Sequence, residues 1–112
     1  MRSDRLRLLD TIDQIDLIRR FSAGGREVFF GDILTQSAVL HRLALLGEAC
    51  AGLSPQLREA HPEVPWSQII AFRNVVIHEY FAIDLDLVWA IITEHAASLR
   101  ASLASIANSL PG

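Results

Sequence analysis

Apolar residues recur every three or four positions along most of this chain, and this spacing constrains the fold more than any other feature. The first such stripe consists of Leu8, Ile12, Ile15 and Ile18. A period near 3.6 places its members on one face of an α-helix, whereas a strand would show alternation. The pattern predicts a first helix over residues 4–22, ended by the paired glycines Gly24 and Gly25.

The same spacing predicts a second long helix, followed by a short one. The second helix is expected over residues 31–53, and Phe29 and Phe30 should pack against its start or contact a partner. Its expected buried stripe is Ile33, Val39, Leu43, Leu46, Cys50 and Leu53. Ser54 caps a helix N-terminus well and Pro55 suits the first helical position, so a short helix is predicted through residue 60.

Two more long helices follow a linker that contains Pro62 and Pro65. The third should begin at Trp66 or Ser67, and the fourth should be capped by Asp84. The expected buried stripe of the fourth is Leu85, Val88, Trp89, Ile92, Ala96, Leu99 and Leu103. The sequence therefore predicts an all-α fold, an antiparallel up-down bundle of four main helices plus a short helix, as a single domain over residues 1–112.

Composition narrows the class of protein. The 112 residues are enough for one core, and the charged N-terminus lacks the apolar segment of a signal peptide. No apolar run is long enough to cross a bilayer, so we expect a cytoplasmic protein without a membrane partner. The single cysteine, Cys50, excludes an intrachain disulfide.

Metal and cofactor signatures are missing from the sequence. The four histidines, His41, His61, His78 and His95, fall on four separate segments without a metal-binding motif. We therefore expect no metal site and no cofactor. The net charge of -3 disfavours broad, nonspecific binding of nucleic acid, although all ten basic residues are arginines suited to phosphate.

A polar group interrupts the apolar pattern in the segment RNVVIHEY, residues 73–80. On a helical wheel Val75 and Val76 join the core face, while a second face spans about 160°. That second face contains Arg73, Asn74, Ile77, His78 and Tyr80, with Arg73 and Tyr80 nearly aligned. Glu79 would point toward the core, so the helix is expected to end or distort there.

This polar face has the chemistry needed to cleave RNA without a metal. Histidine exchanges a proton near neutral pH, so His78 could deprotonate a 2′-hydroxyl. Arg73 could stabilise charge on the phosphoryl group, and Asn74 could orient an oxygen atom. A structural interpretation remains open at this point, in which Arg73 pairs with an acid such as Glu48 and His78 caps or packs.

The pattern R-N-x-x-x-H-x-Y at residues 73–80 resembles the signature of the HEPN superfamily. More closely, the chain is similar to HepT-like toxins encoded beside a minimal nucleotidyltransferase (MNT) antitoxin. The supporting segments are LTQSAV at 34–39, LGEA at 46–49, PWSQIIAF at 65–72, YFAIDL at 80–85 and VW at 88–89. The pattern departs from expectation at Ala71, Phe72 and Ala82, which affects helix packing rather than the polar set.

The resemblance implies a homodimer whose two motif helices form one composite endoribonuclease site. Arg73 and His78 would be catalytic with Asn74 as a helper, and we place Glu48 in support of Arg73. The antitoxin is implied to bind the toxin or to transfer AMP to Tyr80, where the added phosphate would lie beside Arg73. Two alternatives are a non-catalytic RNA- or nucleotide-binding subunit that partners a nucleotidyltransferase, and a purely structural dimerisation domain.

Overall fold

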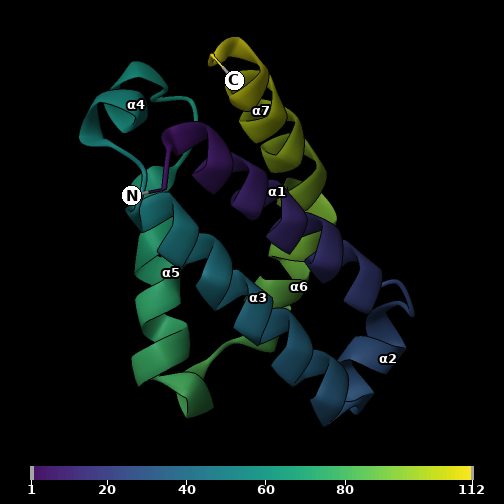
Figure 1. Ribbon diagram of the computed structural model, residues 1–112. Coiled ribbons are helices and arrows are strands. Elements are labelled where there is room, and N and C mark those ends of the chain that lie inside the picture. Colours follow the sequence, from purple (N-terminus) through teal and green to yellow (C-terminus); the bar gives the residue numbers. More distant parts are fainter. Residues whose placement is uncertain (1, 112) are drawn as a thin grey trace.

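The computed structural model describes residues 2–111, and helices make up its regular structure (Figure 1). In chain order the elements are α1 (Asp4–Phe21), α2 (Arg26–Gly31), α3 (Ile33–Ala51), α4 (Pro55–Ala60), α5 (Trp66–His78), the 3-10 turn η1 (Tyr80–Ala82), α6 (Leu85–Ala90), the π-helical segment η2 (Ile91–His95) and α7 (Ala96–Ser109). The long elements are α1, α3, α5 and the run α6–η2–α7, and they alternate in direction. The predicted all-α antiparallel bundle is therefore confirmed. Among residues 2–111, no helix has both the length and the apolar character needed to span a membrane.

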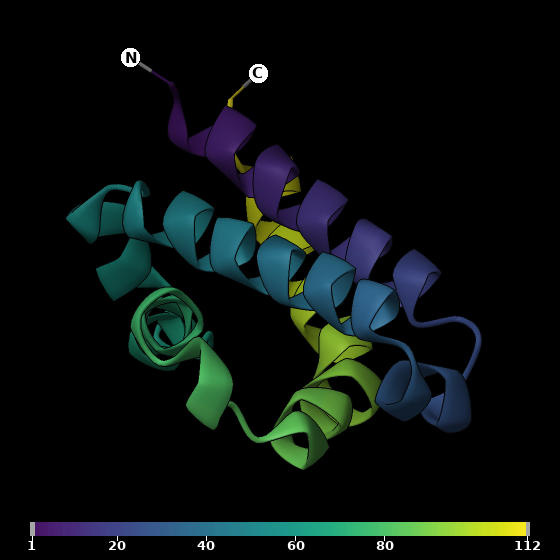
Figure 2. The same ribbon diagram turned by 90° about the horizontal axis from the view of Figure 1, so that it is seen from below.

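Helix α3 is the centre of the packing. It contacts α1 along one side and α5 along another, while α7 packs mainly against α1. Viewed along α5, this helix stands beside α3 and apart from the α6–α7 run (Figure 2). The most deeply buried core residues of α1, α3, α6 and α7 include Leu8, Ile15, Val39, Cys50, Val88 and Leu103, and α5 adds Trp66 and Val76. The position of α5 therefore depends chiefly on its contact with α3.

Short-range capping sets several of the helix ends. The Ser54 hydroxyl accepts a hydrogen bond from the Leu57 amide at 3.2 Å, and the Asp84 carboxylate accepts one from the Asp86 amide at 2.9 Å. Both predicted caps are confirmed. Ser54 also donates from its hydroxyl to Asp4 at 2.6 Å, which ties the start of α4 to the start of α1.

The region before α3 differs from the prediction. Residues 26–31 form the separate helix α2, and Asp32 then adopts an extended backbone with φ −127° and caps α3. This break makes Ile33 a first-turn residue, and it is 77% exposed instead of buried as expected. Phe29 is fully buried, with its ring centroid 5.2 Å from that of Phe30 and 5.3 Å from that of Trp89. The two phenylalanines thus form a small aromatic core with the fourth long element.

The fourth long element is also less regular than predicted. Its middle, Ile91–His95, is π-helical, so one turn contains an additional residue relative to an α-helix. From the expected stripe, Val88, Ala96 and Leu103 are buried, while Leu99 is only partly buried. A sequence pattern of period 3.6 does not reveal such a local change of period.

Candidate active site

The polar residues of the motif lie on α5 and just beyond its end. Arg73, Asn74 and His78 belong to α5, whose last residue is His78, and Tyr80 belongs to η1. Glu79 leaves the helical region with φ −132° and ψ 38°, although its amide still donates to the Val75 carbonyl at 2.8 Å. The expected end of the helix at Glu79 is confirmed. The expected alignment of Arg73 and Tyr80 on one helix is wrong, because the helix ends between them.

Arg73 is held by two side chains. Its Nη1 donates to Glu48 Oε2 at 2.6 Å, and its Nη2 donates to Asn74 Oδ1 at 3.2 Å. The Arg73 side chain is 25% exposed, whereas that of Glu48 is 67% exposed. The anticipated pairing of Arg73 with Glu48 is therefore present, but at the surface rather than around a buried carboxylate. The contact restricts where the guanidinium can point, which is the requirement for orienting a phosphate.

Gly47 allows this arrangement because α3 and α5 approach closely at this position. A Cβ atom added at Gly47 would lie 2.5 Å from the Cβ of Arg73 and 3.1 Å from the carbonyl oxygen of Ile69. Both neighbours belong to the body of α5, so neither can move without moving that helix. Glycine at this position thus lets the Arg73 backbone sit against α3, with Glu48 as the adjacent residue.

Tyr80 contacts a different part of α3. Its hydroxyl lies 3.3 Å from the hydroxyl of Ser37, and its ring packs edge-on against Phe81 with 5.7 Å between centroids. Ser37 and Glu48 are eleven residues apart on one helix, which is about 16 Å along its axis. Tyr80 and Arg73 therefore contact positions on α3 that are about three turns apart. The expectation that a phosphate on Tyr80 would lie beside Arg73 stays a prediction.

The electrostatics of the site are balanced rather than strongly positive. Glu48 compensates the charge of Arg73, and the buried Arg73 Nε–H finds no hydrogen-bond partner among residues 2–111. Each Nη nitrogen carries two hydrogens, so Arg73 can keep its contacts with Glu48 and Asn74 and still donate to a phosphate oxygen. His78, five residues later, is exposed on the last turn of α5. The described residues contain no group of three or more His, Cys, Asp or Glu side chains placed to hold a metal ion.

Two residues that position the site were not identified from the sequence alone. Gly47 could have been found from the sequence, because a glycine inside a helical pattern often marks a close packing contact. Ser37 could not have been found in this way, because its partner Tyr80 is 43 positions away along the chain. The roles assigned to Arg73, Asn74, His78 and Glu48 stay predictions.

Replacing Gly47 with alanine should lower the free energy of unfolding by about 1–3 kcal/mol, because the added methyl overlaps α5. Gly31→Ala is the matched control, since an added Cβ there meets nothing within 4 Å. Chemical denaturation monitored by circular dichroism measures both variants. Equal stability of the Gly47→Ala and Gly31→Ala proteins would contradict the close helix crossing.

The sequence is similar to that of a known protein family and of several known proteins. The family described as "Ribonuclease HepT-like" matches residues 11–106. The chain is 35% identical over 103 residues to "Probable ribonuclease HepT" of Thermococcus cleftensis, covering 88% of this chain and 91% of that protein. It is 32% identical over 90 residues to "Putative RNase TTE0752" of Caldanaerobacter subterraneus, covering 80% of each.

A longer relative matches as well. The chain is 30% identical over 112 residues to "Gamma-glutamylcyclotransferase and putative RNase MJ0434" of Methanocaldococcus jannaschii, covering 98% of this chain but 50% of that protein. No solved structure gives a significant match.

Proposed function

Because the chain belongs to the HepT-like ribonuclease family, we propose that it is an endoribonuclease that cleaves RNA without a metal ion and acts as the toxin of a HEPN/MNT toxin–antitoxin pair. The observation that carries this proposal is the fixed geometry around Arg73. One arginine is oriented by Glu48 and Asn74, and an exposed histidine follows about 7.5 Å further along the same helix axis.

The proposed reaction uses the 2′-hydroxyl of RNA as the nucleophile. His78 accepts the proton of that hydroxyl, and the 2′-oxygen attacks the adjacent phosphorus. The bond from phosphorus to the 5′-oxygen then breaks, and a protonated histidine supplies the proton to this leaving group. Arg73 stabilises the additional negative charge on the phosphoryl oxygens in the transition state. The products are a 2′,3′-cyclic phosphate and a 5′-hydroxyl.

A homodimer would supply the second histidine and the second arginine, and a cluster of exposed apolar side chains beside the site supports such an interface. Ile77 and Phe81 are exposed at the end of α5, and Ile33 and Leu34 are exposed at the start of α3. The Ser37–Tyr80 contact brings these two ends together. We name Ile33, Leu34, Ile77 and Phe81 the tip cluster. A second copy packed on the tip cluster would bury apolar surface and bring two motif helices together.

Regulation is proposed to act through Tyr80. A partner nucleotidyltransferase would bind the protein or catalyse attack of the Tyr80 hydroxyl on the α-phosphorus of ATP, with pyrophosphate as the leaving group. The hydroxyl belongs to a side chain that is 41% exposed, which supports access by another enzyme. His78 is only two residues from Tyr80, whereas Glu48, the partner of Arg73, is eleven positions along α3 from Ser37, the partner of Tyr80. The attached AMP would therefore exclude RNA from His78 by its bulk and charge.

Removing the proposed catalytic groups should abolish cleavage. His78→Ala and Arg73→Ala are each expected to lower the rate of RNA cleavage by at least about 100-fold and to relieve growth inhibition. His41→Ala, an exposed histidine on α3, is the matched control and should keep full activity. Cleavage of purified cellular RNA, followed by gel electrophoresis, reports the rate.

A folded His78→Ala protein that still cleaves at the wild-type rate would refute the catalytic assignment. Tight RNA binding by the wild-type protein with no cleavage would instead favour the non-catalytic binding subunit.

Substitution in the tip cluster should separate the protomers. Phe81→Glu places a charge on a fully exposed aromatic position, so it should leave the fold intact and convert a dimer to a monomer. Sedimentation equilibrium measures the oligomeric state, with Phe81→Leu as the conservative control. A Phe81→Glu protein that remains dimeric would exclude this surface as the interface.

Modification of Tyr80 can be tested by mass. Co-expression with the neighbouring nucleotidyltransferase should add one or more AMP units to the intact protein, and Tyr80→Phe should gain none. Intact-mass spectrometry is the measurement. An equal mass gain in the Tyr80→Phe protein would place the modification elsewhere.

A further inference from the structure

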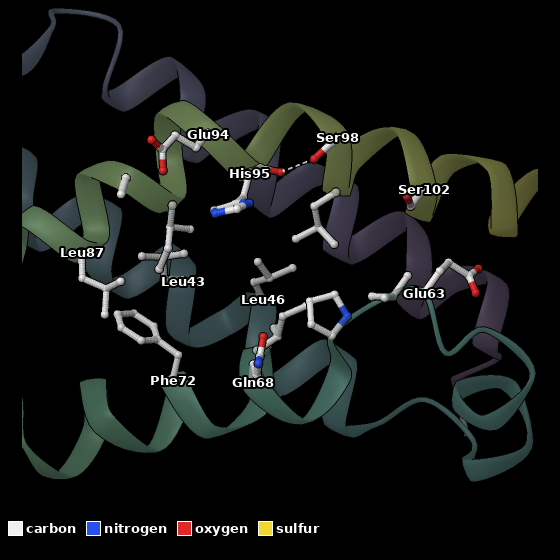
Figure 3. A pocket seen from close by; sticks show the side chains of 16 residues that line it. Leu43, Leu46, Glu63, Gln68, Phe72, Leu87, Glu94, His95, Ser98 and Ser102 are labelled. Atoms are coloured by element: carbon white, nitrogen blue, oxygen red, sulfur yellow. Dashed lines mark hydrogen bonds between the residues drawn. The ribbon is translucent and has the colours of Figure 1, made fainter.

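A groove runs between α5 and the α6–η2–α7 element, on a different side of α5 from the candidate active site (Figure 3). Its cavity volume is about 730 Å³, within the usual range for binding pockets. Leu43 and Leu46 of α3 form its floor, and Phe72 contributes one wall. Around α5, the mean direction of Gln68 and Phe72 lies about 120° from that of Asn74 and His78, so the groove and the candidate active site use separate faces.

The opposite wall has the pattern of a helix-packing face. Its lining residues recur every three or four positions from Leu87 to Ser102, which is about 22 Å along the element. Among the described residues, the main contacts of α5 are with α3 and η1, and the main long-range contacts of α7 are with α1. Among residues 2–111, this stripe therefore lacks a main helix contact of its own, although Ile91 and Leu99 are partly buried against the core. The two walls run side by side, which leaves an elongated slot of the shape that a helix fills (Figure 3).

The π-helical segment lies at the middle of this wall. Ile91, Glu94 and His95 all belong to it and all line the groove. The His95 ring projects into the groove, and the His95 carbonyl accepts a hydrogen bond from Ser98 at 3.1 Å (Figure 3). Such segments are rare and occur often at functional sites, because they change which side chains share a face. Here the segment contributes the charged or titratable residues of this wall, Glu94 and His95, beside the apolar Leu87, Ala90 and Leu99 and the polar Ser98 and Ser102.

Charge indicates what kind of helix would fit. Glu63 and Glu94 line the groove, and its lining includes no arginine. Glu63 Oε1 lies 3.1 Å from His61 Nδ1. Glu94 extends from the rim of the groove near His95 (Figure 3). An occupant that carries lysine or arginine beside an apolar stripe would complement both glutamates. A second copy that offered its own groove would instead bring glutamates together, which disfavours self-association here.

We propose that this groove binds an amphipathic helix of a partner protein. The apolar stripe of that helix packs on Leu43, Leu46 and Phe72, and basic side chains on its flanks pair with Glu63 and Glu94. The interaction does not depend on ribonuclease activity, because its surface is separate from His78 and Tyr80.

A displayed library of helical 18-residue peptides tests the proposal with the full-length protein as bait. Peptides with apolar residues at i, i+3, i+4 and i+7 and with basic flanks should be enriched. Fluorescence anisotropy with a selected peptide then compares three variants. Leu87→Glu and Glu94→Lys should each weaken binding at least tenfold. Glu59→Lys, the same charge change on exposed α4, should leave binding unchanged.

A peptide whose basic flanks are replaced by glutamate should bind the Glu94→Lys protein, because the charges on both sides are then exchanged. A nonspecific attraction of basic peptides to an acidic protein would give no such recovery. The proposal is overturned if no peptide is enriched, or if Leu87→Glu and Glu94→Lys bind as the wild type does. It is also overturned if these variants change the oligomeric state in sedimentation equilibrium, since a second copy would then cover the groove.

Discussion

The close crossing of α3 and α5 at Gly47 is the contact on which the rest of the site depends. Without a Cβ at this position, the Arg73 backbone packs directly against α3, and the next residue, Glu48, reaches its guanidinium. Because α5 makes its main helix-to-helix contact with α3, this crossing sets the position of the whole motif helix. A buried glycine and a surface ion pair thus act together. Gly47 allows the backbone and Cβ of Arg73 to pack against α3, and Glu48 holds the guanidinium at the far end of the side chain.

The end of α5 divides the motif into two parts. Arg73 and Asn74 lie within the helix near Glu48, whereas Tyr80 turns toward Ser37 at the other end of α3. In the proposed function, the first part orients a phosphate and the second is the site of regulation. It also exposes Ile77 and Phe81 next to His78. A protein of net negative charge can then concentrate arginine at one place by pairing two copies, rather than by a basic surface.

The attachment of α5 mainly through α3 has a second consequence. It leaves the side of α5 that faces α6–α7 open, and the π-helical segment places Glu94 and His95 along that opening. A single helix therefore presents two surfaces, one polar, with Arg73, Asn74 and His78, and the other mainly apolar with an acidic rim. Binding at one surface need not block the other.

The sequence by itself determined the long helices, the caps at Ser54 and Asp84, and the end of the motif helix at His78. These features depend on periodicity and on hydrogen bonds between near neighbours, which short segments encode. It also pointed to Arg73, Asn74, His78 and Tyr80 through their order. The cap at Asp32, which splits off α2, is also local, and the prediction missed it. Only the tertiary structure decided that Tyr80 contacts Ser37 and that a groove stays open beside α5. Those outcomes follow from how closely distant helices approach, and residues such as Gly47 and Ser37 set that approach with partners many positions away.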